Sequence, residues 1–260
     1  MLLLLLWAPI AIPLHWLIRD RNLANILTLL ILYAQFLWLV RRWGQQVHHQ
    51  HQILRHYGLE LSRQNGLYVL RGLGIGCSSV LLLLGFETIL GWIQWQSPSL
   101  ATLRIVLEGL IVALALGFAE ELLFRGWMLD ELQRDYAPVA ALWANAILFA
   151  ALHLRLWTFP ALVLLGVALV WAKRSHYETR LGKRFQLLGL PIGLHAGLVW
   201  SNYIVEVGQL IQYRDRVPTW VTGIDRNPLA GVMGVLLLGI LALVMWRYAM
   251  MQPRPASLKL

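Results

Sequence analysis

The sequence is poor in cysteine and in charged residues. Cys77 is the only cysteine among 260 residues, so an internal disulfide is excluded. Charged residues make up only 13% of the chain, whereas hydrophobic residues make up 58%. This composition excludes an ordinary soluble domain, and no polar stretch is long enough to form a separate one. We therefore expect residues 1–260 to form a single membrane domain.

Apolar segments recur along the whole chain and predict an all-α, polytopic transmembrane helical bundle. A helix needs about 20 mostly apolar residues to cross a bilayer. About eight segments approach that length. They lie at residues 2–18, 23–40, 67–94, 103–124, 137–153, 157–172, 187–205 and 229–246.

The basic residues indicate how these spans are oriented. Lys and Arg number 22 against 13 Asp and Glu, which gives a formal net charge of +9. The connections after the second, fourth and sixth spans, together with the C-terminal tail, carry more Lys and Arg than the connections on the other side. Such a bias marks the cytoplasmic side of a membrane protein and does not call for a nucleic-acid partner. We therefore predict a multi-pass protein of a bacterial inner (plasma) membrane, with both termini in the cytoplasm and lipids around it.

The stretch from Phe118 to Gly126 places ionisable side chains at the end of an apolar run. The ionisable residues of this stretch are Glu120, Glu121 and Arg125. Charged groups are costly inside a bilayer, so their presence in a span indicates a function. Glu121 and Arg125 are four residues apart, so they share a helix face and can form an ion pair. Glu120 lies about 100° away around the helix and is free to act in chemistry.

Two histidines lie in later apolar runs. If the chain turns near Tyr136, antiparallel helices bring His153 to nearly the same depth as Glu120. A carboxylate facing an imidazole suits a general base that polarises water, or a metal site. In the seventh run, His195 and Asn202 share a helix face, and neutral side-chain donors at that depth can stabilise an oxyanion. Gly193 and Gly197 beside His195 would let another helix, or the backbone of a substrate, approach closely.

These three elements together resemble the motifs of the CAAX protease and bacteriocin-processing (CPBP, or Abi) family of intramembrane proteases. The motifs are Glu120-Glu121-x-x-x-Arg125, Phe149-x-x-x-His153 and the Gly-Leu-His-Ala-Gly stretch at 193–197, and the resemblance covers about residues 100–205. It implies a hydrolase that cleaves a peptide bond of a membrane-associated protein or peptide in the cytoplasmic leaflet. The family includes the enzyme that removes the last three residues of prenylated proteins.

The resemblance also implies roles for the individual residues. Glu120 would activate the attacking water, and His153 would help to bind that water or a metal. Glu121 and Arg125 would shape the site, and His195 would polarise the scissile carbonyl together with an Asn. The family places this Asn four residues after the histidine, where this chain has Val199. Asn202 is the only nearby candidate for the same role.

Two questions remain open at the level of the sequence. The family is often described as metalloproteases, and Glu120, His153 and His195 could ligate Zn²⁺ and leave one position for water. No His-Glu-x-x-His motif is present, however, and the same residues also serve a metal-free glutamate mechanism. Val199 favours a second function, a non-catalytic membrane interaction or regulatory protein on the same fold. A transporter is disfavoured, because the chain has no duplicated halves.

Overall fold

The fold is described from a computed structural model, which covers residues 2–180, 183–214, 217–224 and 227–252. Contacts divide the chain into two compact units, Met1–His56 and Tyr57–Leu260. Each unit is described by itself. The expectation of a single membrane domain stays a prediction.

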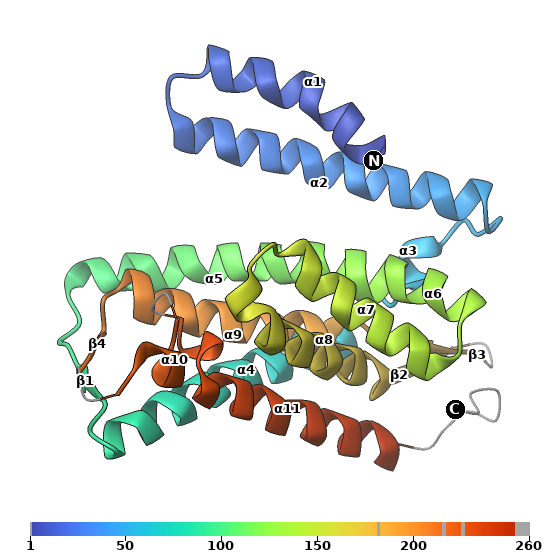
Figure 1. Ribbon diagram of the computed structural model, residues 1–260. Helices are drawn as coiled ribbons and strands as arrows, with labels where there is room; N and C mark the ends of the chain where they lie inside the picture. Colours follow the sequence, from blue (N-terminus) through green and yellow to red (C-terminus); the bar gives the residue numbers. More distant parts are fainter. Residues whose placement is uncertain (1, 181–182, 215–216, 225–226, 253–260) are drawn as a thin grey trace. The chain divides into compact units, whose positions relative to one another are not determined.

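The unit Met1–His56 is a helical hairpin. Helix α1 (Leu2–Leu17) is followed by α2 (Arg21–Gln46) and a single turn, α3 (Ile53–His56) (Figure 1). Asp20 ends the tight connection, and its side chain accepts a hydrogen bond from the Leu23 N–H at 3.2 Å, as an N-cap does. The Trp7 indole donates to the Thr28 carbonyl at 2.7 Å and ties the two helices together.

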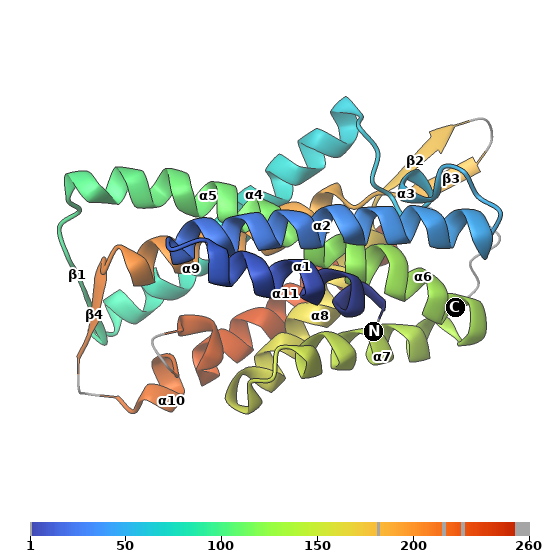
Figure 2. The same cartoon turned by 90° about the horizontal axis from the view of Figure 1, so that it is seen from above.

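The unit Tyr57–Leu260 is a bundle of apolar helices. Its order is α4 (Arg63–Ile89), β1 (Ile93–Trp95), α5 (Leu100–Glu121), the π-helix η1 (Leu122–Met128), α6 (Leu129–Asp135), α7 (Pro138–Leu152), η2 (Leu156–Thr158), α8 (Phe159–Arg174), β2 (Tyr177–Arg180), β3 (Lys183–Gln186), α9 (Gly189–Val207), β4 (Ile211–Tyr213), α10 (Thr219–Thr222), η3 (Pro228–Ala230) and α11 (Val232–Met251). The strands pair antiparallel, β1 with β4 and β2 with β3, and the two pairs lie at opposite ends of the bundle (Figures 1 and 2).

The chain is an all-α, multi-pass membrane protein, as the sequence predicts. Each of the eight predicted segments corresponds to a helix in the part of the chain that the structure describes. Five helical stretches are long and apolar enough to cross a membrane, namely Leu23–Gln46, Arg63–Ile89, Leu100–Asp135, Leu156–Arg174 and Val232–Met251. Two further apolar helices, Leu2–Leu17 and Pro138–Leu152, are shorter.

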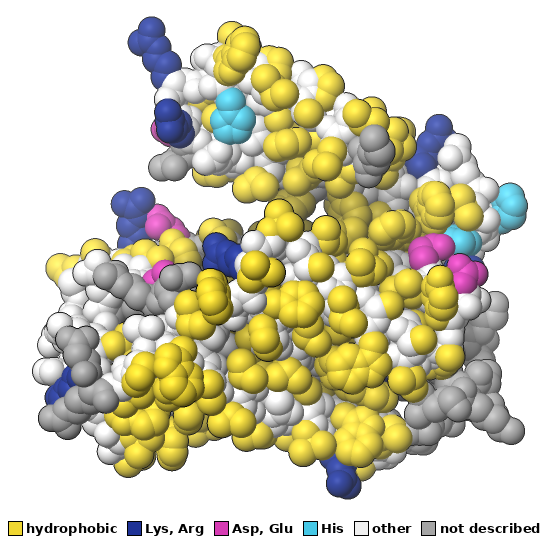
Figure 3. Space-filling view, in the orientation of Figure 1, with side chains coloured by type: hydrophobic (Ala, Val, Ile, Leu, Met, Phe, Trp, Pro, Cys, Tyr) yellow, Lys and Arg dark blue, Asp and Glu magenta, His cyan; other side chains and the backbone are white. Residues whose placement is uncertain are grey.

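The outer surface suits a lipid environment. Hydrophobic side chains predominate over the face that α7, α8 and α11 present in Figure 3. Large apolar residues on these helices are half exposed, among them Trp143, Ile147, Leu236, Ile240 and Leu243. In water such a surface would be a liability, whereas lipid tails solvate it without cost.

Helix α9 is the centre of the bundle, because it packs against α4, α5 and α8. Glycines make its approach to α4 close, as the sequence predicts. A Cβ atom added to Gly193 would lie 1.9 Å from the Val69 carbonyl oxygen, and one added to Gly72 would lie 2.3 Å from the Leu190 carbonyl oxygen. Backbone therefore meets backbone along this interface, which fixes the position of His195.

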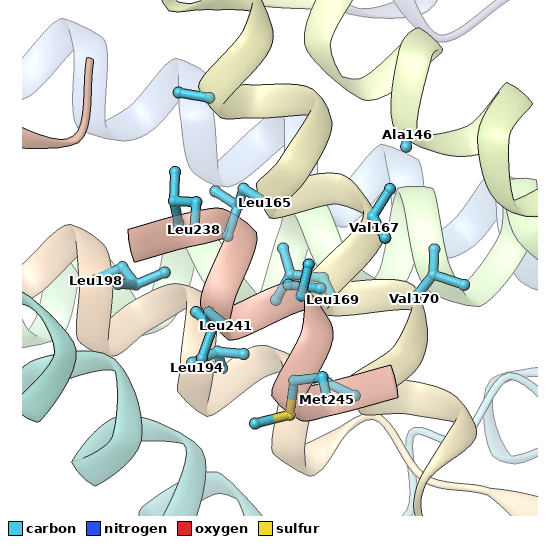
Figure 4. Packing of buried hydrophobic residues seen from close by; sticks show 14 of the residues in the cluster. Ala146, Leu165, Val167, Leu169, Val170, Leu194, Leu198, Leu238, Leu241 and Met245 are labelled. Carbon is cyan, nitrogen blue, oxygen red and sulfur yellow. The ribbon is translucent and has the colours of Figure 1, made fainter. Parts of the chain in front are cut away.

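Leucine and valine side chains fill the space between α8, α9 and α11 (Figure 4). Leu165 and Leu169 of α8 lie among Leu194 and Leu198 of α9 and Leu238 of α11, and each of these side chains is buried. A core packed in this way leaves little freedom for the polar residues on the same helices.

Candidate active site

The predicted site residues come from four elements of the bundle. Glu120 and Glu121 are the last two residues of α5, and Arg125 lies in η1. His153 follows the end of α7, and His195 lies in the first half of α9. The structure brings all five side chains together, although 75 residues of sequence separate Glu120 from His195.

The Glu121 side chain is fully buried, and one of its carboxylate oxygens contacts two other side chains. Its Oε1 atom lies 2.9 Å from Arg125 Nη1 and 2.9 Å from His195 Nδ1. The predicted ion pair between residues 121 and 125 is therefore confirmed, and both of its side chains have no exposed surface. A buried carboxylate is tolerable here because a guanidinium lies directly against it.

Arg125 is held from the other side by α7 and α8. Its Nη2 donates to the Gly166 carbonyl at 3.4 Å, and its guanidinium carbon lies 4.3 Å from the centre of the Phe149 ring. The ring face attracts a cation, so Phe149 stabilises Arg125 in addition to Glu121. Phe149 also belongs to the second sequence motif, which explains why that motif contains an aromatic residue beside the histidine.

Glu120 points to the two histidines. Its Oε2 atom lies 3.8 Å from His153 Nε2 and 3.9 Å from His195 Nε2. The prediction that Glu120 and His153 lie at the same depth is confirmed. About a fifth of the Glu120 side chain is exposed, and 29% of His153, in contrast to Glu121, although the Glu120 Oε2 atom itself is buried. Within the described residues, Glu120 Oε2 has no hydrogen-bond partner.

The hydrogen bonds of the two imidazoles define where their protons lie. His153 Nδ1 is 2.7 Å from the Phe149 carbonyl oxygen, which can only accept, so Nδ1 carries the proton. His195 Nδ1 faces the Glu121 carboxylate oxygen and also carries a proton. In both rings it is the other nitrogen, Nε2, that faces Glu120 Oε2.

Both imidazole Nε2 atoms thus lie within 4 Å of the same carboxylate oxygen. Each separation from Glu120 Oε2 is longer than a direct hydrogen bond, and such a gap between polar atoms is the usual place of a bridging water. A water there could donate to the carboxylate and to one imidazole. Its oxygen would then become more nucleophilic, because Glu120 is placed to accept a proton from it.

The same three side chains are the ones for which the sequence suggests a metal. Two imidazole Nε2 atoms and a carboxylate are ligand types that Zn²⁺ accepts, and each Nδ1 has the hydrogen bond that usually orients a metal-bound histidine. As these side chains stand, however, no group of three or more His, Cys, Asp or Glu in the described part of the chain is arranged to hold a metal ion. The arrangement therefore does not fit a preformed three-residue metal centre.

Asn202 lies apart from this cluster. Its Nδ2 atom is 3.5 Å from Glu206 Oε2, one turn further along α9. No contact that the structure gives for the described residues joins Asn202 to Glu120, Glu121, His153 or His195. Its Oδ1 atom is buried without a hydrogen-bond partner. The oxyanion role of Asn202 stays a prediction.

Sequence reasoning missed the π-helix and the two side chains that bind its backbone. Asn145 Nδ2 donates to the Phe124 carbonyl at 2.7 Å, and Lys173 Nζ donates to the Arg125 carbonyl at 2.5 Å. Lys173 counted among the basic residues of a cytoplasmic connection, but it is buried at the end of α8. Asn145 could have been noticed, since it is a polar residue inside the apolar run that leads to His153.

A comparison with known families agrees with the geometry. Residues 102–201 match the family model described as Type II CAAX prenyl endopeptidase Rce1-like. The match contains Glu120, Glu121, Arg125, His153 and His195. It ends one residue before Asn202. Neither a curated protein nor a solved structure matches the chain.

Proposed function

Through residues 102–201 the chain belongs to the Rce1-like CAAX-protease family, and from this premise we propose that it is an intramembrane endopeptidase. It would hydrolyse a peptide bond of a membrane-associated protein or peptide, with a water that Glu120 activates. The observation that carries the proposal is the position of Glu120 Oε2, within 4 Å of the Nε2 atoms of both His153 and His195.

The first step is the attack of water on the scissile carbonyl carbon. Water held between Glu120 and His153 forms the new C–O bond while Glu120 takes its proton. The His153 lone pair keeps that water in place, since the Phe149 carbonyl fixes the ring by its Nδ1–H. The proton then passes from Glu120 to the leaving amine as the C–N bond breaks, which returns Glu120 to its carboxylate form.

The second requirement is a donor for the oxygen that becomes negative during this attack. For this role the His195 ring would take up a proton from water on Nε2 before the attack and keep it, and this N–H could donate to that oxygen. Glu121 keeps the His195 ring in position through Nδ1, and Arg125 keeps Glu121 in position. Glu121 and Arg125 are thus positioning residues, whereas Glu120, His153 and His195 would touch the water or the substrate.

A bound zinc ion is a separate proposal, which the sequence suggested. Glu120, His153 and His195 would be its ligands if they moved closer together, and a bound Zn²⁺ would supply a Lewis acid for the same hydrolysis. No step of the mechanism above depends on it. Dialysis of the purified protein against a chelator leaves the cleavage rate unchanged in this mechanism, and a loss of activity that Zn²⁺ restores would argue for the metal.

The substrate would be reached within the membrane. Large apolar residues cover the outside of the helices around the site, so a substrate that carries its own lipid or apolar anchor could approach laterally. The positive-inside bias supports a cytoplasmic location for the basic connections and for both termini. The bacterial plasma membrane stays a prediction.

The proposal is tested by cleavage of membrane-anchored peptides with the protein in proteoliposomes. Products are identified by mass spectrometry. We expect Glu120→Gln to lower the rate at least about 100-fold, because a general base contributes about 10²–10⁴. Glu108→Gln is the matched control, since Glu108 is also in α5 but is half exposed and pairs with Arg104. Equal rates for Glu120→Gln and the unmutated protein would refute the proposal.

A non-catalytic interaction protein is the second candidate function. It rests on Val199, which stands where the family has Asn, and on Asn202, whose side chain contacts Glu206 instead of the site. In that case the polar cluster would bind a partner's transmembrane segment. Co-purification from membranes separates the two functions. A partner that stays intact with both the unmutated protein and Glu120→Gln favours binding, and a partner that accumulates only with Glu120→Gln favours cleavage.

A further inference from the structure

The π-helix η1 changes the backbone pairing directly after the two glutamates. In a π-helix each N–H bonds to the carbonyl five residues earlier, and such turns occur frequently at functional sites. The Leu129 N–H bonds in this way to the Phe124 carbonyl, at the end of η1. The α-helix that follows resumes pairing four residues apart, so the next N–H does not bond to the carbonyl five residues before it. The carbonyl of Arg125 is skipped.

Lys173 supplies the donor that this carbonyl lacks. Its Nζ atom lies 2.5 Å from the Arg125 carbonyl oxygen, and its side chain is 5% exposed. A buried carbonyl without a donor is destabilising, so the bond favours the π-helix over a regular α-helix. Lys173 reaches Arg125 from α8, 48 residues later in the sequence.

Asn145 binds the neighbouring carbonyl from another helix. Its Nδ2 donates to the Phe124 carbonyl at 2.7 Å, while that carbonyl also accepts from Leu129. The two contacts differ in one respect. Phe124 keeps a backbone donor if Asn145 is removed, whereas Arg125 has none if Lys173 is removed.

The pairing of η1 determines where Arg125 lies relative to α7 and α8. If η1 returned to α-helical pairing, its turn would contain one residue fewer than the π-turn does. The residues after it would rotate by about 100° around the axis. Arg125 would still share a helix face with Glu121, because residues four apart do so in an α-helix as well. It would however turn away from the Phe149 ring of α7 and the Gly166 carbonyl of α8, which hold it from the other side.

We propose that Lys173 is a positioning residue, which holds the π-helix by its bond to the Arg125 carbonyl and thereby keeps Arg125 against Phe149 and Gly166, where it supports the Glu121 carboxylate for the reaction. The proposal rests on the proposed function as far as catalysis is concerned. The part that concerns the π-helix does not, because it can be measured in a protein without any substrate.

The experiment compares Lys173→Met with Arg174→Met in the full-length protein. Met keeps the length of the apolar stem but has no donor. Arg174 is the matched control, because it is the next residue of α8, is also buried, and donates to the Pro138 carbonyl instead of η1. Hydrogen exchange by mass spectrometry follows the amides of residues 122–130. We expect at least about tenfold faster exchange in Lys173→Met and unchanged exchange there in Arg174→Met.

Two further measurements make the outcome decisive. Lys173→Gln keeps a donor on a shorter side chain, and we expect intermediate exchange, which still reports on the bond if Lys173→Met does not fold. We also expect the pH profile of cleavage to change in Lys173→Met, whereas mere loss of folded protein would lower the rate equally at every pH. Unchanged exchange in Lys173→Met, or an equal rise in Arg174→Met, would overturn the proposal. Absence of cleavage by the unmutated protein would refute the proposed function and leave the exchange result to decide the role of Lys173.

Discussion

Glu121 Oε1 lies 2.9 Å from Arg125 Nη1 and 2.9 Å from His195 Nδ1, so a single carboxylate oxygen joins the first sequence motif to the third. The adjacent Glu120 faces the opposite nitrogen of the same His195 ring. The two glutamates therefore divide their tasks. Glu121 is buried and orients the histidine, whereas Glu120 is partly exposed and is available for water.

The first prediction concerns the buried ion pair. Arg125→Met removes the guanidinium and leaves the Glu121 charge buried, so we expect the free energy of unfolding to fall by about 3–5 kcal/mol. Arg134→Met is the control. Arg134 forms the same i,i+4 pair with Asp130, but this pair is partly exposed and its loss should cost at most about 1 kcal/mol. Unfolding in detergent measures both, and equal losses would contradict the buried character of the pair.

The second prediction concerns the close approach of α9 to α4. A Cβ at Gly193 would lie 1.9 Å from the Val69 carbonyl oxygen, so Gly193→Ala must push the helices apart and displace His195. We expect a marked loss of both stability and cleavage. Gly74→Ala on α4 has nothing within 4 Å of the new methyl group. There we expect a gain of up to about 1 kcal/mol, because Ala is the better helix former. A neutral Gly193→Ala would disprove the tight packing.

The third prediction concerns pH and His176, which follows α8 outside the predicted spans. Burial lowers the pKa of His176 from 6.5 to about 4, and its ring packs on Tyr68 with centroids 3.9 Å apart. Above pH 6.5 the ring is neutral in both the folded and the unfolded chain, so it costs nothing. Between pH 6.5 and 4 only the unfolded chain binds the proton, and stability falls as the pH falls.

The size of this effect follows from the shift in pKa. At about 1.4 kcal/mol for each pH unit, the folded protein should lose about 3 kcal/mol by pH 4. Unfolding measured at pH 7 and at pH 4.5, for the unmutated protein and for His176→Phe, isolates this contribution from that of the other groups. As the pH falls, the unmutated protein should lose stability relative to His176→Phe, and a difference in the free energy of unfolding that does not change with pH would contradict the buried, neutral state of His176.

The fourth prediction concerns Asn202. Its side chain contacts Glu206 on the same helix, so we expect Asn202→Ala to change kcat by less than about threefold. A residue that stabilises an oxyanion would cost about 10²–10³ in kcat when removed. A loss of that size would show that Asn202 turns toward His195 when substrate binds, as the sequence comparison implies.

Most contacts of the polar cluster around Glu120 and Glu121 could be predicted from the sequence, because local patterns determine them. Helical spacing places Arg125 on the face of Glu121, and equal distances from the turn near Tyr136 place His153 opposite Glu120. The role of the glycines beside His195 also follows from their size. The structure bears out each of these contacts.

The π-helix and Lys173 could not be predicted in this way. A π-turn has no residue pattern of its own, and it depends on donors from other helices, here Asn145 and Lys173. A lysine at the end of an apolar run also has the same sequence signature as a membrane-flanking residue. Only the tertiary packing of α8 against η1 shows that Lys173 is buried.

The measurement that tests the central claim most directly is a double-mutant cycle on cleavage by Glu120→Gln, His153→Ala and the combined variant. Residues that act on one water form a unit, so the combined variant should be about as slow as the slower single variant. Thermal unfolding of all the proteins controls for folding. If the two losses instead multiply, Glu120 and His153 act independently, and the shared water between them is contradicted.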